Sequence, residues 1–230
     1  MPLKAVVFDF DGTLATLNVD FVEMRREIIA LLARYEVPCG SLENLFALEM
    51  VDAGSRALGV KDPGQGRRFM DEALQLIHDI EMKGARKGSL LEGIEDMLSL
   101  LKRKGIKTAI VTRNCIDAVR CIYPGVHESF NAIISREFTP RVKPHPDHLR
   151  IALEQMGVLP HHTAMVGDHP MDIMAGKKAG SFTVGVLTGH SGADALGGAG
   201  ADLVIPDAVS ITRHIEFPGN TSPRDTNLPC

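Results

Sequence analysis

The sequence predicts an α/β protein whose core is a doubly wound parallel sheet, interrupted once by an inserted segment of helices. Short continuous apolar runs recur along the chain, as in strands that are buried on both faces of a parallel sheet. Helical patterns lie between these runs and end in glycine, which is the alternation of a βαβ protein. Residues 16–85 break this alternation, because they contain several helical patterns and no convincing strand.

Six apolar runs are expected to form the sheet: residues 5–8, 107–112, 131–135, 163–167, 182–187 and 201–206. Three helices are expected between them, over residues 91–104, 146–156 and 170–179. Proline begins two of these helices and glycine follows all three, which is the usual asymmetry of helix ends.

The inserted segment is expected to be a helical cap. Asp20 with Glu23 has the spacing of a capping box and predicts a helix through residues 28–35. Ser41 is expected to begin a second helix that ends at Gly59. Residues 61–66 are expected to form a loop, and residues 67–83 a third helix.

The predicted domains therefore alternate along the chain. Residues 1–15 and 86–217 are expected to form the α/β core, and residues 16–85 the cap. Residues 218–230 have turn and breaker residues without periodicity, which favours a flexible tail.

The composition excludes several functional classes. The chain has 230 residues, of which 44% are hydrophobic, so it can bury a substantial core. A formal charge of −4 argues against a nucleic-acid or anionic-membrane partner. No apolar run approaches the roughly 20 residues that span a bilayer, and the first residues do not resemble a secretory signal. The four cysteines lack metal-site spacing, and a cytoplasmic protein with reduced thiols is expected. The oligomeric state cannot be read from the sequence.

Polar residues follow four of the predicted strands. Asp9 and Asp11 end the first apolar run, and the segment 112–114 (Thr-Arg-Asn) ends the second. Lys143 comes after the third, and Asp168 with Asp172 after the fourth. Since active sites of open parallel sheets form outside the carboxyl ends of the strands, these groups are expected to meet at one edge.

Crowded carboxylates repel one another and need a cation or a shifted pKa. Ligands that are all oxygen favour Mg²⁺, and a lysine, a hydroxyl and backbone amides are suited to a phosphate. One carboxylate can attack phosphorus to form an aspartyl-phosphate, and a second one can protonate the leaving oxygen. The expected partner is a small phosphorylated metabolite.

Four segments in order resemble the motifs of the haloacid dehalogenase-like (HAD) hydrolase superfamily: DFDGTL, VTRN, KPHPD and GDHPMDIMAGKKAG. The resemblance is to the branch with a helical cap after the first strand, as in phosphoglycolate phosphatase. It implies a Rossmann-like core and a Mg²⁺-dependent phosphatase for a small phosphomonoester. It covers residues 4–14 and about 88–207, whereas the cap matches only in position and helical character.

The resemblance also implies roles for individual residues. Asp9 would be the nucleophile and Asp11 the general acid/base. Thr112 would bind the transferring phosphoryl group, and Lys143 would neutralise both this group and Asp9.

For the metal, the resemblance implies Asp168 together with the Asp9 carboxylate and the Asp11 backbone carbonyl. Asp172 would support the metal from its edge. Arg113 and Asn114 are expected to contact the phosphate or the rest of the substrate.

Two departures and two alternatives remain at this stage. His169 stands where the family commonly has serine or threonine, and the acid at Asp11 disfavours halide displacement. The alternatives are a phosphoglucomutase-like phosphotransferase and a non-catalytic regulatory module on the same fold.

The Gly-rich residues 188–202 are expected to be a flexible connection around a short helix. The following histidines are expected at the surface or at helix starts: His145, His148, His161, His162 and His169.

Overall fold

The computed structural model describes residues 3–42 and 44–214, which divide into two compact units. The first unit contains the chain up to residue 15, residues 90–113, and the chain from residue 125 onward. The second contains residues 16–89 and 114–124. The assignment of residues 16–85 as a cap domain stays a prediction, and the tail predicted over 218–230 lies outside the described residues.

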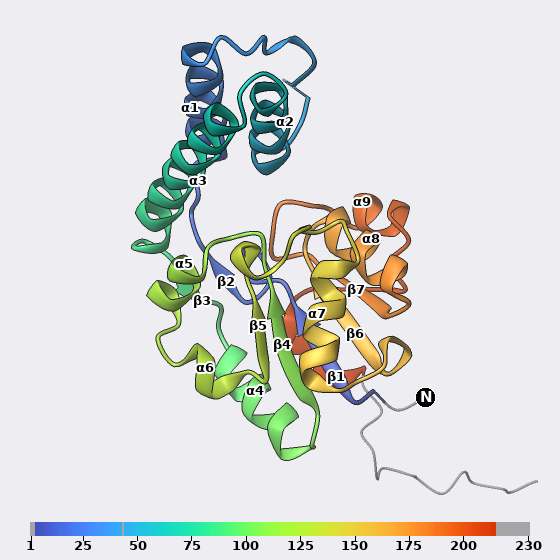
Figure 1. Ribbon diagram of the computed structural model, residues 1–230. Coiled ribbons are helices and arrows are strands. Elements are labelled where there is room, and N and C mark those ends of the chain that lie inside the picture. The colour runs from blue at the N-terminus through green and yellow to red at the C-terminus, as the bar shows by residue number, and fades with distance from the viewer. Residues whose placement is uncertain (1–2, 43, 215–230) are drawn as a thin grey trace, which may run out of the picture. The chain divides into compact units, whose positions relative to one another are not determined.

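The first unit is built on a six-stranded sheet in the order β5-β4-β1-β6-β7-β8 (Figure 1). Every neighbouring pair is parallel, and Ala5 of β1 lies opposite Lys107 of β4 and Thr163 of β6. The predicted α/β fold with a doubly wound, Rossmann-like sheet is confirmed. The strands are β1 Ala5–Phe8, β4 Lys107–Val111, β5 Ala132–Ile134, β6 Thr163–Gly167, β7 Phe182–Val186 and β8 Leu203–Ile205. A separate two-stranded sheet pairs β2 Ala15–Thr16 with β3 Ser89–Leu90.

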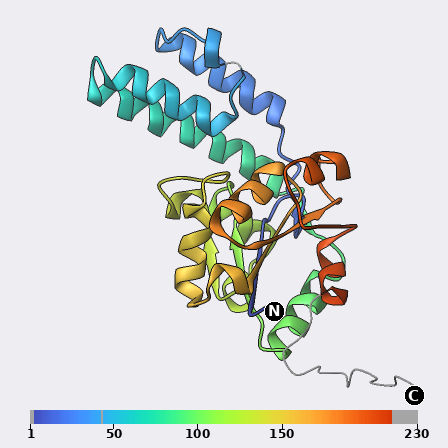
Figure 2. The same ribbon diagram turned by 90° about the vertical axis from the view of Figure 1, so that its right-hand side faces the viewer.

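Helices cover both faces of the six-stranded sheet. Figure 2 shows α7 and α8 on one side of it and α4 on the other. On the first side, alternate strand residues such as Val7, Val111 and Ile134 pack with the buried face of α7. The helices of this unit are α4 Ile94–Arg103, α6 Val126–Ser129, α7 Asp147–Met156, α8 Pro170–Ala179 and α9 Ala193–Gly198.

The predicted helix ends agree with the structure at all three glycines, and Gly105 follows α4 in the left-handed conformation with φ of 71°. Gly157 and Gly180 end α7 and α8 in the left-handed conformation, with φ of 62° and 84°. Only the start of α4 differs from the prediction: the helix begins at Ile94 and not at residue 91, because Gly93, also left-handed, is its N-cap. Short 3-10 helices cover Gly40–Leu42, Arg136–Phe138, Pro160–His162 and Ala208–Arg213.

Within its described residues, the second unit contains four α-helices: α1 Phe21–Arg34, α2 Ala47–Gly59, α3 Pro63–Ala85 and α5 Ile116–Ile122. Its core contains residues from the first three, among them Ile28, Met50 and Phe69, which are almost completely buried. The last helix packs against α3. Residues 114–124, which follow β4 in the sequence, therefore group with the inserted helices.

Two predicted helix boundaries in this unit are wrong. The helix that was expected to begin at Ser41 begins at Ala47, after a 3-10 turn. The loop expected over residues 61–66 is largely helical, since α3 starts at Pro63. Asp62 caps it by accepting the Gly64 N–H at 2.8 Å, so Asp-Pro acts here as a helix start and not as a turn.

Only one of the two hydrogen bonds of the capping box predicted at α1 is present. Asp20 accepts the Glu23 N–H at 2.7 Å and caps the helix as expected. The Glu23 carboxylate instead pairs with Lys83 of α3, at 2.8 Å. Across residues 3–42 and 44–214, no helix is both long enough and apolar enough to cross a membrane.

Candidate active site

Asp9 and Asp11 lie in a tight turn at the carboxyl end of β1. The Asp9 N–H donates to the Val166 carbonyl at 2.8 Å, which ties the start of this turn to β6. The Asp9 carboxylate accepts the Phe10 N–H at 2.7 Å. Gly12 completes the turn with φ +76°, a conformation that favours glycine, and a Cβ there would lie 2.6 Å from the Asp168 Oδ2.

Asp168 and Asp172 come from the end of β6 and the first turn of α8. The His169 N–H donates to Asp172 Oδ2 at 3.0 Å, and His169 Nδ1 accepts the Met171 N–H at 3.2 Å. His169 thus caps α8 with its ring, as serine or threonine caps a helix with a hydroxyl. Burial, followed by the charges of Lys143 and Arg113, lowers the pKa of His169, so the ring stays neutral and can accept this bond.

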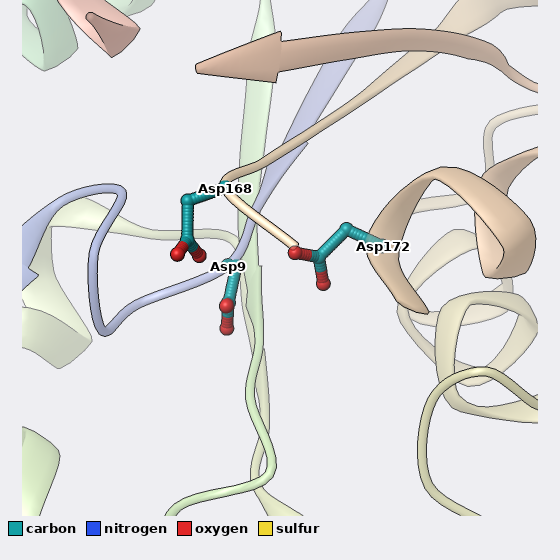
Figure 3. A group of neighbouring side chains, drawn as sticks. All are labelled: Asp9, Asp168 and Asp172. Carbon is teal, nitrogen blue, oxygen red and sulfur yellow. The ribbon is translucent and has the colours of Figure 1, made fainter. Parts of the chain in front are cut away.

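The structure brings three of the predicted carboxylates together. Asp9, Asp168 and Asp172 each offer an oxygen that lies within 4.8 Å of those of the other two (Figure 3). The side chain of Asp11, which is half-buried, is not a member of this group. Its predicted metal contact is through the backbone carbonyl and stays a prediction.

Lys143 lies in the loop between β5 and α7 and is 1% exposed. Its ammonium lies 2.8 Å from Asp9 Oδ1 and 2.6 Å from Asp172 Oδ1. Burial opposes the charge of this ammonium, but the carboxylates of Asp172 and Asp9 outweigh that effect and raise its pKa. Lys143 is therefore held as a cation between two carboxylates.

The aspartates are in an environment that resists their ionisation. Burial raises the pKa of Asp9 to about 6 against the opposing charge of Lys143. Burial, and then the charge of Asp9, raises the pKa of Asp168 to about 6, and burial also raises that of Asp172. With all groups ionised, three carboxylates and one ammonium leave two negative charges, which one divalent cation would balance. The donor set fits Mg²⁺.

Of the predicted site residues after β4, Thr112 and Arg113 belong to the first unit and Asn114 to the second. Thr112 is fully buried in the first unit, and its N–H donates to the Ile134 carbonyl at 3.0 Å. Arg113, in the same unit, donates through Nη1 to the Lys143 carbonyl at 2.7 Å. Asn114 belongs to the second unit, where its amide faces Glu81 Oε1 at 3.4 Å. Their predicted contacts with phosphate or substrate stay predictions.

The loop after β7 contributes to the site, although it was not predicted to be part of it. The His190 N–H donates to Asp168 Oδ2 at 3.2 Å, and the Thr188 hydroxyl donates to the Gly12 carbonyl at 2.6 Å. A Cβ on Gly189 would overlap the Asp168 carboxylate. The segment was expected to be a flexible connection, and the expected short helix is α9. Residues 188–190, the first three of this segment, contact Gly12 and Asp168 directly.

The chain is similar to proteins of a known hydrolase family. Residues 3–180 match the sequence model of a family described as haloacid dehalogenase-like hydrolase. A haloacid dehalogenase-like hydrolase domain-containing protein of Arabidopsis thaliana is 31% identical over 182 residues, which are 79% of this chain and 69% of that protein. The phosphoglycolate phosphatase of Psychrobacter arcticus is 29% identical, over 83% of this chain and 86% of the enzyme.

A solved structure agrees in fold. The crystal structure of a hydrolase from Pseudomonas syringae superimposes with a TM-score of 0.66 at 22% identity and covers 92% of this chain and 97% of its own. At this identity the match supports the fold and not the substrate.

Replacing Gly189 with alanine is expected to damage the site without unfolding the protein. The added Cβ would displace the Asp168 carboxylate, so we expect the protein to lose most of its Mg²⁺ affinity and at least about tenfold in activity. Gly192→Ala is the matched control, because a Cβ there meets nothing within 4 Å. Mg²⁺ titration by calorimetry, with thermal melts of both variants, checks this. Equal Mg²⁺ affinities in the two variants would contradict it.

Replacing Asp168 with asparagine is expected to stabilise the metal-free protein. The pKa of Asp168 is raised in the fold, so its stabilising effect is present at low pH and is lost as the pH rises through about 6. At pH 7.5 its charge therefore destabilises the metal-free fold, and Asp168→Asn removes that charge.

We expect the variant to melt a few degrees above wild type in EDTA, since 1 kcal/mol corresponds to about 2–4 °C in a chain of this size. Added Mg²⁺ should raise the melting temperature of wild type far more than that of the variant. An equal Mg²⁺ response in the two proteins would argue against Asp168 as a ligand.

Proposed function

The chain belongs to the haloacid dehalogenase-like hydrolase family and is a phosphatase, and we propose that it hydrolyses a small phosphomonoester with Mg²⁺, through a phosphorylated Asp9. The observation that carries this proposal is the group of three aspartates, buried Asp168 and Asp172 with half-buried Asp9, which lies with Lys143 at the carboxyl ends of β1 and β6. A phosphoglycolate-like substrate is proposed from the similarity to the Psychrobacter enzyme.

In the first step, an Asp9 carboxylate oxygen attacks the phosphorus of the substrate. The bond between phosphorus and the leaving oxygen breaks, and Asp11 donates its proton to that oxygen. The products are the free alcohol and an aspartyl-phosphate at Asp9. In the second step, water attacks the phosphorus while Asp11 accepts its proton. Phosphate leaves, and the Asp9 carboxylate is restored.

The positive side chain of Lys143 serves both steps. Its ammonium is 2.8 Å from Asp9 Oδ1, so it keeps the nucleophile oriented and partly offsets the repulsion between the carboxylate and an anionic substrate. Thr112, at the end of β4, is proposed to hydrogen-bond an oxygen of the transferred group. Arg113 and Asn114 are proposed to contact the substrate.

Asp9, Asp168 and the Asp11 carbonyl would hold Mg²⁺, and Asp172 would support it. When bound, the cation would neutralise the crowded carboxylates and the phosphoryl oxygens. Both Asp172 oxygens already face a donor, Lys143 on one side and the His169 N–H on the other. Asp172 is therefore proposed to orient Lys143 as well as to support the metal.

The choice of leaving group is proposed to come from the helical segment over residues 16–85. This segment carries no sequence motif that names a substrate. The proposed phosphoglycolate-like specificity thus depends on measurement with a panel of substrates.

We expect Mg²⁺-dependent phosphate release from one or more small phosphomonoesters, phosphoglycolate among them, and its loss in Asp9→Asn. Asparagine has nearly the same shape but cannot attack phosphorus as a carboxylate does, so the loss should be roughly 10³-fold or more in kcat. Asp96→Asn, at an exposed position on α4, is the control and should retain wild-type activity. Activity that survives in Asp9→Asn would mean that another group is the nucleophile.

We expect the phosphorylated enzyme to accumulate in Asp11→Asn. With p-nitrophenyl phosphate the leaving group needs no proton, so the first step continues, whereas the attacking water loses its base. Mass spectrometry after acid quenching should show a gain of one phosphoryl group, absent when Asp9 is also replaced by asparagine. If Asp11→Asn turns over slowly and yet never carries a phosphoryl group, the covalent mechanism is wrong.

A further inference from the structure

We propose that His148 is a positioning residue for Lys143: its ring fixes the main chain of Lys143, so that the ammonium reaches Asp9 and Asp172 together. This inference rests on the proposed function, because it concerns how the proposed catalytic lysine is held. The sequence predicts His148 at the surface or at a helix start; the residue is the second of α7 and is completely buried, so the surface position is wrong. The sequence offers no reason to connect the ring with Lys143.

The ring of His148 is completely buried and links the Lys143 loop to the sheet. Nδ1 accepts the Lys143 N–H at 3.1 Å. Nε2 lies 3.1 Å from the carbonyl oxygen of Ile134, the last residue of β5. The main chain of Lys143 is thereby tied, through one rigid ring, to the end of β5, the edge strand of the sheet beside β4.

Only one state of the imidazole satisfies both contacts. Because Nδ1 accepts a backbone N–H, it carries no proton, and Nε2 must then carry the proton that it donates to Ile134. Burial, and then the charge of Lys143, lowers the pKa of His148 to about 3, so the ring remains in this neutral form throughout the neutral pH range. The orientation of the ring is therefore fixed.

Arg113 binds the other main-chain polar group of Lys143, its carbonyl oxygen. Its Nη1 donates to the Lys143 carbonyl at 2.7 Å, so both main-chain polar groups of Lys143 are bound by side chains. The lysine side chain has four rotatable bonds, and its ammonium can meet two carboxylates only if its Cα is well placed. A displacement of about 1 Å in a reacting group can cost 10²-fold in rate.

An apolar residue would fill the place of His148 at less cost. Leu149 and Leu153 of α7 are buried in the same part of the unit, and leucine has no polar atoms to desolvate. What the imidazole adds is one acceptor for Lys143 and one donor for Ile134. The two contacts can be removed separately.

Three substitutions separate these contacts. In His148→Asn, the amide oxygen takes the position of Nδ1 and keeps an acceptor for the Lys143 N–H. In His148→Gln, the amide nitrogen takes the position of Nε2 and keeps only the donor to Ile134. His148→Leu removes both. Asparagine and glutamine each lose one buried hydrogen bond, so we expect similar decreases in melting temperature for the two.

Two measurements on the full-length protein test the proposal. Amide hydrogen exchange of Lys143, followed by NMR, should remain slow in wild type and His148→Asn and become faster in His148→Gln and His148→Leu. The kcat/KM for p-nitrophenyl phosphate with Mg²⁺ should stay within about threefold of wild type in His148→Asn. It should fall at least about tenfold in His148→Gln, mostly in kcat.

Three outcomes would contradict either the role of His148 or the proposed function. If activity in both variants falls only in step with melting temperature, His148 has a structural role and the proposal is wrong. If exchange at Lys143 is equally slow in His148→Gln, the hydrogen bond does not hold the main chain, and the proposal is again wrong. If wild type hydrolyses no phosphomonoester, the proposed function fails, and exchange at Lys143 still decides whether His148 fixes its main chain.

Discussion

Inside the first unit, the ammonium of Lys143 lies 2.8 Å from Asp9 and 2.6 Å from Asp172, in a place that is almost closed to water. Carboxylates in such a place resist ionisation unless a positive charge is close to them. Lys143 supplies one such charge, and the two negative charges that remain would suit a divalent cation. The surrounding backbone is arranged so that these charged groups can lie close together without steric overlap.

The backbone meets this need mainly with glycine and with backbone amides. Gly12, Gly167 and Gly189 come so close to the aspartates that a Cβ on any of them would overlap a carboxylate. The N–H groups of Phe10, His169 and His190 donate to Asp9, Asp172 and Asp168. Each carboxylate is thus oriented by its own amide before any substrate or metal is present, which is the preorganisation that electrostatic catalysis requires.

The grouping of the charged side chains could be predicted from the sequence, because a parallel sheet brings the residues after its strands to one edge. Asp9, Lys143, Asp168 and Asp172 were grouped on this basis and lie together. The loop at Thr188–His190 also follows a strand, β7, but its contact with Asp168 comes from the His190 N–H and from the missing side chain of Gly189, and neither feature marks a site residue in a sequence. The start of α3 at Pro63 was missed because Asp-Pro-Gly also fits a turn, and only the packing of the helix decides between the two readings.

The grouping of residues 114–124 with the inserted helices has a consequence for the whole chain. The carboxylate of Glu81, on α3, accepts the Cys115 N–H at 3.0 Å, and Ala118 and Val119 of α5 are buried. A shortened chain that joined residue 15 directly to residue 90 would keep α5 but delete its packing partner α3. It would expose apolar side chains of α5 and remove the Glu81 carboxylate that accepts the Cys115 N–H, just beyond Thr112. The insertion is therefore not a removable module: through α5, the segment that follows Thr112 depends on it for folding.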